Sequence, residues 1–469
     1  MNIVLTNTLT GTKQTFVPRI RGQVSMYVCG ITPYDDSHVG HARVYVSFDV
    51  LYRLLRYCGY QVTYCRNFTD VDDKIIRKSE QEFGNQTHAA EIAQRYIKNY
   101  HADMLKLNCT APAHEPCVTQ HIPEIIAFIQ GLIDKGVAYE IDGDVYFGIQ
   151  QFPCYGALSK HKLEDLRAGA RVEVNEKKRD PLDFALWKHE PEGLSWPSPW
   201  GPGRPGWHIE CSALAEKYLG QQIDIHAGGL DLVFPHHENE KAQSEALNSV
   251  PFVNYWLHNG FVRVNEEKMS KSLGNFFTLR DVFKHSHPMV VRYYILTHHY
   301  RAPLEFSFEG LQSSEKSYRK LCRTFASVTA DKNITYESQT AIQPIQDMLK
   351  FLCDDLNTPG LFGVLYGELN SLNQVTSTAD NDLLSAGAAH LSSTLPDLIQ
   401  ARAIKGFLIE VLGLTLEPLP ETKTAVTPEM TQLLADREHA RAKKDWARAD
   451  QLRDQLQALG YQVQDKKKN

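Results

Sequence analysis

The spacing of apolar residues near the start of the chain predicts a strand, a helix and a second strand. Residues 25–29 form a short apolar run that is typical of a buried strand. Within residues 41–57 the apolar positions recur at helical spacing, and Gly59 stands where a helix would end in a left-handed residue before a strand at 61–66. Such a unit implies a parallel sheet that binds ligands at the carboxyl ends of its strands.

The pattern changes twice along the rest of the chain. Residues 116–200 mix a short helical pattern, strand-like runs and a Trp/Pro/Gly-rich end, and we interpret them as an insertion into the fold around them. From residue 307 onward the pattern is helical, with a Pro/Thr-rich linker near 415–427 and a predicted helical hairpin at 429–459. We therefore expect an α/β part followed by helical parts.

Composition indicates a multidomain globular protein. The chain has 469 residues, of which 42% are hydrophobic, and no apolar run approaches the roughly 18 residues that cross a bilayer. Its nine cysteines form no tight framework, which is typical of thiols kept reduced, so we expect a cytoplasmic protein without a membrane segment. The net charge of −6 indicates that any nucleic-acid contact depends on local basic patches.

One motif suited to phosphate lies at the turn from the first predicted strand into the helix. It reads His38-Val39-Gly40-His41. A helix start offers unpaired backbone N–H groups and a partial positive charge, both of which favour phosphate. Gly40 would let a ligand approach the backbone, and the two imidazoles could donate to a triphosphate.

A second motif, Lys268-Met269-Ser270-Lys271-Ser272, follows a strand-like run and is predicted to form a loop. Its two ammonium groups, three residues apart, could neutralise charge that develops on an α-phosphate and a leaving pyrophosphate. A basic surface loop without special function is the alternative for this motif taken alone.

Together the two motifs resemble the signature motifs of class I aminoacyl-tRNA synthetases. The resemblance implies a Rossmann-type parallel-sheet catalytic domain in which the carboxylate of an amino acid attacks the α-phosphate of ATP, with Mg²⁺ accompanying the nucleotide. Positioning and charge stabilisation would dominate such a reaction. The resemblance implies both ATP binding and catalysis for His38, His41, Lys268 and Lys271. It implies ATP binding alone for Gly40.

Cysteine, histidine and glutamate residues form a third group of candidates. Cys29 ends the first predicted strand, Cys211 lies much later, and His236 and Glu240 are four apart on what would be one face of a helix. Two thiolates, an imidazole and a carboxylate are a plausible zinc sphere, and zinc can accept a further sulfur ligand. Spacing alone leaves three other candidate ligands open, which are His226, His237 and Glu238.

Four blocks extend the resemblance to the cysteinyl-tRNA synthetases over nearly the whole chain. They are residues 27–30, 66–74, 206–211 and 234–240. The resemblance implies one Zn²⁺ per chain, bound by Cys29, Cys211, His236 and Glu240, which would hold the thiol of L-cysteine as thiolate. It also suggests three residues beside the substrate, Thr69, Trp207 and His226, although Trp207 would fit a core as well.

The same resemblance assigns a role to each part of the chain. The catalytic domain would consist of residues 1–115 and 201–306, the connective insertion of 116–200, the helical bundle of 307–414 and the anticodon-binding domain of 415–469. The implied partners are tRNA(Cys), L-cysteine and ATP, and we expect a monomer. Basic residues and an aromatic in the last segment could contact phosphates and unpaired bases.

Two features depart from the pattern of the family. Many members carry a further tail with Gly, Thr, Trp and Arg, which this sequence does not show, so contacts made by that tail are not carried over. Ala227 and Leu230 also stand where Gly and Ser are expected, and local nucleotide contacts would differ accordingly.

Three other functions share part of this pattern. A ligase of the same fold could join cysteine to an amino sugar, but it would not need the helical C-terminal region. A zinc hydrolase could use His236 and His237 with Glu238 as base, which would leave the Lys-Met-Ser-Lys-Ser loop unexplained. A non-enzymatic RNA-binding protein would have no reason to keep the complete catalytic set.

The insertion carries no recognisable editing module, which leads to a first prediction. Serine differs from cysteine by one atom, and ordinary contacts separate near-isosteres by only a few kcal/mol. A zinc that prefers soft sulfur would discriminate directly, so a second hydrolytic site is not needed. We expect the protein to leave tRNA(Cys) mischarged with serine intact, measured as acylated tRNA over time. Hydrolysis above the spontaneous rate would show that the prediction is wrong.

Overall fold

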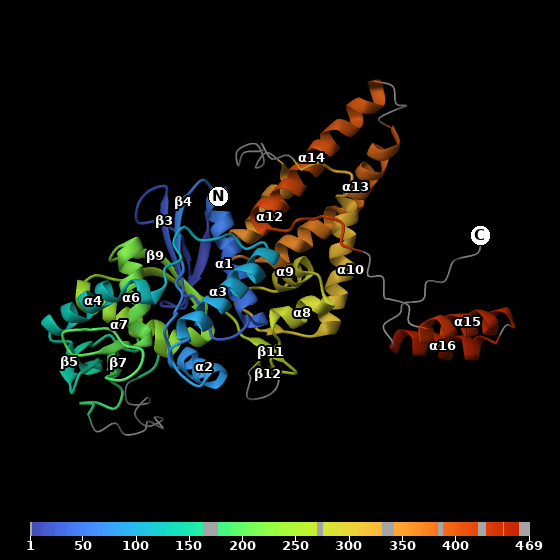
Figure 1. Cartoon of the computed structure of the whole chain (residues 1–469). Coiled ribbons are helices and arrows are strands. Elements are labelled where there is room, and N and C mark those ends of the chain that lie inside the picture. Colours follow the sequence, from blue (N-terminus) through green and yellow to red (C-terminus); the bar gives the residue numbers. More distant parts are fainter. Residues whose placement is uncertain are drawn as a thin grey trace. The chain divides into compact units, whose positions relative to one another are not determined.

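The computed structural model describes residues 2–162, 177–269, 275–330, 342–382, 388–420, 428–443 and 445–458. The chain forms two compact units, Met1–Glu417 and Pro418–Asn469 (Figure 1). Within the described residues, no helix is both long and apolar enough to cross a bilayer.

A four-stranded parallel sheet lies at the centre of the first unit. Its strands, in spatial order, are β10 (Val253–Asn259), β9 (Ile223–Gly229), β3 (Gln23–Val28) and β4 (Gln61–Cys65). The predicted strand-helix-strand unit is confirmed, because α1 (Val39–Tyr57) connects β3 to β4 and Gly59 has a φ of +87°. The sheet belongs to the parallel class that the sequence indicated.

Helices that pack on and around this sheet carry the rest of the functional segments. They are α2 (Asp73–Phe83), α3 (Ala89–Lys106), α4 (Ile122–Asp134), α6 (Trp207–Leu219) and α7 (Glu238–Asn248). Tyr27 of β3 lies in the same buried core as Ile209 and Leu214 of α6. Side chains of an extended chain alternate between its faces, so Tyr27 of β3 and Cys29, which directly follows the strand, lie together in the core with α6.

A second sheet, which is antiparallel, lies between α4 and α6 in the sequence. It consists of β5 (Ala138–Ile141), β6 (Asp144–Phe147), β7 (Phe184–His189) and β8 (Gly203–Pro205). Gly206 follows β8 and caps α6, and its N–H donates to the carbonyl of Leu186 (2.8 Å). A Cβ on Gly206 would overlap the carbonyl oxygen of Ala185, so the start of α6 is pressed directly onto β7.

Smaller elements complete the first unit up to residue 305. They are the hairpin β1 (Val4–Asn7) and β2 (Thr12–Thr15), the strands β11 (Val262–Val264), β12 (Glu267–Lys268) and β13 (Leu304–Glu305), and the helices α8 (Leu279–His285) and α9 (Pro288–Leu296). β11 pairs with β12 and with β13, and Lys268, the first residue of the second motif, ends β12.

The described residues after 307 are mainly helical, as predicted. The first unit contributes α10 (Phe308–Thr324), α12 (Gln343–Leu352), α13 (Thr358–Asp382) and α14 (Ala388–Leu412). The second unit is the predicted hairpin, formed by α15 (Pro428–Ala442) and α16 (Trp446–Ala458). Ala440, Ala449 and Leu452 form its small buried core. Residues 421–427 of the predicted linker lie outside the described residues.

A buried ion pair joins α1 to the helical region. Arg292 of α9 donates to Oδ2 of Asp49 (2.5 Å), to the carbonyl of Leu412 (2.7 Å) and to the carbonyl of Leu107 (2.8 Å). Burial raises the pKa of Asp49, but the guanidinium groups of Arg292 and Arg53 outweigh that effect and hold the pKa below its ordinary value. Arg292 therefore connects three segments that are distant in the sequence.

We predict that Asp49→Ala destabilises the fold strongly. The substitution leaves the Arg292 charge buried without its carboxylate, which typically costs about 3–5 kcal/mol. Because the pKa of Asp49 is lowered by folding, the contribution is present above about pH 4 and is lost as the pH falls further. Urea unfolding measures the effect, with Asp354→Ala as control, since the exposed pair of Asp354 with Lys13 is worth about 0–1 kcal/mol. Equal losses in both variants would contradict this account.

Candidate active site

The first motif forms a tight turn at the start of α1. Nδ1 of His38 accepts the backbone N–H of His41 (3.3 Å), Nδ1 of His41 accepts that of His38 (3.4 Å), and the two rings stack with centroids 3.7 Å apart. His38 is the N-cap, so the helix begins at Val39 rather than at the predicted residue 41. A Cβ on Gly40 would lie only 2.7 Å from Cε1 of His38. Any residue other than glycine would therefore push against the His38 ring and disturb the stacked pair.

The second motif approaches the first at this turn. Lys268 is exposed at the end of β12, and its Nζ lies 4.3 Å from the centroid of the Phe261 ring. The Cε atom of Met269 would be 3.8 Å from a Cβ on Gly40. Lys271 falls within residues 270–274, which lie outside the described residues.

The segment that follows the second motif also contacts the turn. The carbonyl of Phe277 accepts the N–H of Val39 (3.3 Å), and the N–H of Leu279 donates to the carbonyl of Ser37 (2.7 Å). Phe276 packs edge-on against the His38 ring. Met269 and residues 276–279 therefore lie against the turn of the first motif, although they come more than 200 residues later in the sequence.

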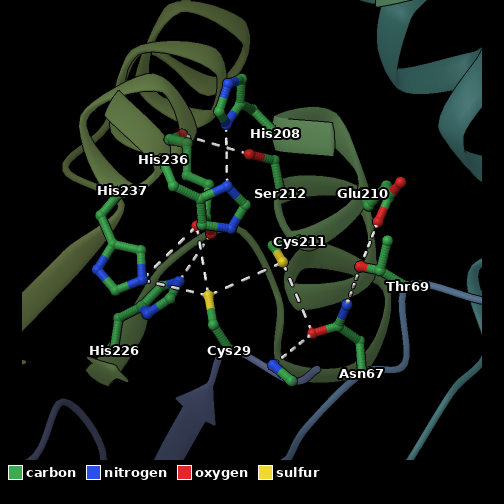
Figure 2. Close-up of polar contacts among 12 residues, drawn as sticks. Cys29, Asn67, Thr69, His208, Glu210, Cys211, Ser212, His226, His236 and His237 are labelled. Carbon is green, nitrogen blue, oxygen red and sulfur yellow. Dashed lines mark hydrogen bonds and ion pairs between the residues drawn. The ribbon is translucent and has the colours of Figure 1, made fainter. Parts of the chain in front are cut away.

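A buried group of thiols, an imidazole and a carboxylate lies at the end of β3. The Sγ atoms of Cys29 and Cys211 are 3.8 Å apart, Sγ of Cys29 lies 3.5 Å from Oε1 of Glu240, and Nε2 of His236 lies 3.0 Å from the same oxygen (Figure 2). All four ligand atoms fall within 4.8 Å of one another, and all four residues are buried. The structure therefore brings together the four residues that the sequence predicted as metal ligands.

A second group overlaps with the first. Nε2 of His226 lies 2.7 Å from Oε2 of Glu240, and Nε2 of His237 lies 3.2 Å from Sγ of Cys29. These two histidines could hold a cation together with Cys29 and Glu240. Glu238 belongs to neither group, and its Oε2 accepts the backbone N–H of Ser159 (2.7 Å).

Local backbone structure explains how His236 and Glu240 face each other. The regular helix α7 begins at Glu238, and the preceding Val233–His237 forms a π-helical turn in which Phe234 is extended (φ −139°, ψ 132°). An irregular turn thus precedes the helix on which His236 and Glu240 were expected to share a face. The spacing of four residues still places both side chains on one face, because helical backbone resumes before His236.

Hydrogen bonds orient the imidazoles from outside the two groups. Nδ1 of His236 lies 2.9 Å from Nδ1 of His208, and Nδ1 of His237 lies 2.8 Å from Nε2 of His258. His258 in turn contacts the hydroxyl of Thr8 (2.7 Å). Partners of this kind fix the orientation of a ligating imidazole and raise its basicity.

The protonation of the group suits a cation. Burial lowers the pKa of His208, His236 and His258 to about 3, so their imidazoles are neutral at neutral pH. Burial raises the pKa of Cys29 well above its ordinary value, and Cys211 and Glu240 act in the same direction. Neutral imidazoles and thiols that lose a proton to a metal are the ligand forms that divalent metals require.

Thr69 and Trp207 occupy different environments beside this group. Thr69 is buried and donates to Oε2 of Glu210 (2.6 Å). Burial raises the pKa of Glu210 well above its ordinary value, while the Thr69 hydrogen bond opposes that shift. Trp207 is 41% exposed, and its ring stacks on His236 with centroids 4.3 Å apart, so it is not a core residue.

The sequence did not indicate three residues that contact these groups. Asn67, His208 and His258 were not among the predicted site residues. Asn67 lies just after the carboxyl end of β4 and His258 near that of β10, which is where a parallel sheet gathers ligand-binding residues. His208 immediately follows Trp207, and this adjacency was the available signal for it.

Two family models match the chain. One, described as the catalytic domain of class I (C) tRNA synthetases, covers residues 15–316, and the other, the anticodon-binding domain of cysteinyl-tRNA ligase, covers residues 423–469. The chain belongs to the cysteinyl-tRNA ligase family. The family assignment agrees with the two motifs and the helical hairpin described above.

Curated relatives and solved structures extend this comparison. The cysteine–tRNA ligase of Geobacter metallireducens is 45% identical over 480 residues, covering 99% of this chain and 98% of that protein. That of Endomicrobium trichonymphae is 45% identical over 477 residues, covering 100% and 98%. The fold resembles methionyl-tRNA synthetase of Mycobacterium tuberculosis in complex with methionyl-adenylate (TM-score 0.60, 14% identity, 84% of this chain and 92% of that chain). It also resembles a putative arginyl-tRNA synthetase from Campylobacter jejuni (TM-score 0.53, 16% identity, 86% and 95%).

Because several imidazoles are buried in the neutral form, we predict that the metal-free protein loses stability on acidification. Folding lowers the pKa of His258 to about 3, so the unfolded chain binds more protons between about pH 3 and 6.5. The contribution to stability is therefore complete above about pH 6.5 and is lost as the pH falls, by up to ~1.4 kcal/mol per pH unit for each histidine. Thermal unfolding of chelator-treated protein from pH 7.5 to 5 measures this dependence.

Two variants show whether the buried histidines cause that dependence. His258→Gln should flatten the decline of the unfolding temperature with pH, because one buried imidazole no longer has to be protonated. His88→Gln, which changes a histidine on the surface near Glu91, should leave the decline unchanged. An identical pH dependence in the wild type and in His258→Gln would contradict the assignment.

Proposed function

We propose that this chain is a cysteine–tRNA ligase, which activates L-cysteine with ATP and transfers it to tRNA(Cys). One observation carries the proposal: a buried Cys29-Cys211-His236-Glu240 group, with its ligand atoms within 4.8 Å, lies at the carboxyl end of β3 in a class I synthetase domain. The 45% identity to named cysteine–tRNA ligases supports the same activity. The anticodon-binding domain supports transfer RNA as the acceptor.

ATP, accompanied by Mg²⁺, is proposed to bind at the start of α1. The helix N-terminus and the imidazoles of His38 and His41 offer donors to phosphate oxygens, and Gly40 leaves the backbone accessible. Lys268 and Lys271 would bring positive charge to the α-phosphate and to the leaving pyrophosphate. These side chains hold and orient the reacting groups, and the carboxylate of cysteine forms the new bond to phosphorus while pyrophosphate departs.

Zn²⁺ fits the first group, and we assign its ligands as Cys29, Cys211, His236 and Glu240, with one ion per chain. Two sulfurs at about 2.3 Å from a tetrahedral zinc lie about 3.8 Å apart, and the two Sγ atoms here are 3.8 Å apart. When bound, the ion supplies a Lewis acid that keeps a substrate thiol ionised. His226 hydrogen-bonds to Glu240, and His237 to Cys29. These contacts fit residues of an outer shell that orient two of the proposed ligands.

Three residues are proposed beside the substrate. Trp207 presents a partly exposed indole face next to His236 and could cover a cysteine whose sulfur is bound there. The ring of His226 contacts Glu240 of the same group, and the hydroxyl of Thr69 donates to Glu210, the residue before Cys211. A soft metal would favour the sulfur of cysteine over the hydroxyl of serine, because ordinary contacts alone separate these amino acids poorly.

The second unit is proposed to contact the anticodon of tRNA(Cys). The matched anticodon-binding model covers most of residues 415–469, the segment predicted to be a separate domain. Trp446, at the start of α16, is 59% exposed and could stack on an unpaired base, with arginines of the hairpin near phosphates. We further propose a monomer that acts in the cytoplasm, as expected from the sequence.

Pyrophosphate exchange tests the proposal. Purified protein with ATP should exchange pyrophosphate in the presence of cysteine, at a rate at least ~100-fold above that with serine or alanine, and should then acylate tRNA(Cys). Exchange without acylation would indicate a ligase with a small acceptor instead. Absence of exchange with zinc-loaded protein would contradict the proposed function.

Substitution of a ligand tests the zinc assignment separately. Cys211→Ser should reduce the bound zinc well below one ion per chain and raise KM for cysteine sharply, because a soft ligand is replaced by a hydroxyl. Cys154→Ser, which changes an exposed cysteine, should keep both values at the wild-type level. Stoichiometric zinc in Cys211→Ser, measured by elemental analysis, would show that the ligand assignment is wrong.

A further inference from the structure

A buried asparagine connects the backbone beside Cys29 to the strand-end segment that follows β4. Oδ1 of Asn67 accepts the N–H of Gly30 (3.0 Å), the residue after Cys29. Nδ2 of the same side chain donates to Oγ1 of Thr69 (3.3 Å) (Figure 2). The N–H of Gly30 requires an acceptor, so it fixes which side of the Asn67 amide carries the oxygen.

The connection continues to the helix that carries Cys211. Oγ1 of Thr69 donates to Oε2 of Glu210 (2.6 Å), and Glu210 immediately precedes Cys211 in α6. The thiol of Cys211 also lies 3.6 Å from Oδ1 of Asn67. The hydrogen-bonded series, which we call the Asn67 bracket, consists of Gly30, Asn67, Thr69 and Glu210.

Close packing leaves the bracket little room to shift. Asn67, Thr69 and Glu210 are each at most 3% exposed. A Cβ on Gly30 would overlap the backbone carbonyl of Asn67, so the two segments are in direct backbone contact. Buried hydrogen bonds of this kind are costly to break, because their groups cannot be satisfied by water.

We propose that Asn67 is a positioning residue that sets the separation of the Cys29 and Cys211 thiols. The inference rests on the zinc centre of the proposed function. The ends of the bracket are the neighbours of the two cysteines, and the 3.8 Å between their sulfurs matches the separation that a tetrahedral zinc requires. Asn67 itself would neither ligate the metal nor contact the substrate.

Cobalt binding to the metal-free, full-length protein tests this role, because Co²⁺ reports thiolate ligation and tetrahedral geometry in its absorption spectrum. Asn67→Leu keeps the size of the side chain but removes its donor and acceptor. We expect a 10- to 100-fold loss of Co²⁺ affinity, the usual effect of removing an outer-shell partner, with weaker thiolate-to-cobalt and ligand-field bands.

Asn357→Leu is the matched control for that variant. Oδ1 of Asn357 also accepts a glycine N–H, that of Gly360 (2.9 Å), but does so at the start of α13. This variant should bind Co²⁺ with the wild-type affinity and spectrum. A loss equal to that of Asn67→Leu would overturn the inference by showing that any lost asparagine cap disturbs the centre.

A second pair of variants tests the bracket at Thr69 while leaving the Gly30 N–H satisfied. Thr69→Val removes the hydroxyl between Asn67 and Glu210 and should also weaken Co²⁺ binding, whereas Thr69→Ser keeps the hydroxyl and should restore it. One thiolate-bound Co²⁺ per chain in the wild type, with unchanged affinity and spectrum in Asn67→Leu and Thr69→Val, would overturn the inference alone. No thiolate-bound Co²⁺ in the wild type would overturn the zinc centre, and the inference with it.

Discussion

The parallel pairing of β3 with β4 on one side and β9 on the other is the constraint on which the rest of the site depends. In this register Tyr27 is opposite both Cys65 and His226, so the three strands end close to one level. The N–H of Cys29 continues the pairing by donating to the carbonyl of Ala227 (3.1 Å). Because parallel strands all point the same way, residues from three distant parts of the sequence are delivered to one edge. A shift by one residue would turn Cys29 to the other face of the sheet.

That edge concentrates polar groups in a place with little water, and the structure satisfies them in two ways. Side-chain hydrogen bonds join the imidazoles to a carboxylate, to a thiol and to each other, so each orients the next. Burial keeps the imidazoles of His208 and His236 neutral, so no repulsion between several positive charges arises beside the thiols. The same burial that would make a lone charge costly therefore prepares the group to accept a doubly charged ion from solvent.

Much of this architecture follows from local patterns in the sequence, and the remainder depends on contacts between segments. The helical spacing and Gly59 were sufficient to predict α1, apart from its first two residues. Residue types and spacing marked the region as a metal site but left His226, His237 and Glu238 open as ligands, so the set of four came from the family resemblance. Asn67 could not be predicted, since an asparagine has many uses and its partners Gly30 and Thr69 become significant only when β3 and β4 are placed side by side. The turn before α7 was also missed, because helical spacing does not reveal one extended residue such as Phe234.

The contact of Gly206 with β7 has a consequence for how this protein can be recombined. Because Gly206 touches the backbone of Ala185 and starts the helix that carries Cys211, the antiparallel sheet and that helix meet without an intervening linker. A chimera that exchanged residues 138–205 for the equivalent segment of a relative would place its junction at Gly206. The two backbones are in direct contact there, so a small mismatch in position could not be absorbed. Successful grafts should therefore cross over after α6, where Gly220 ends the helix at the surface, so that the sheet and the helix are inherited as one piece.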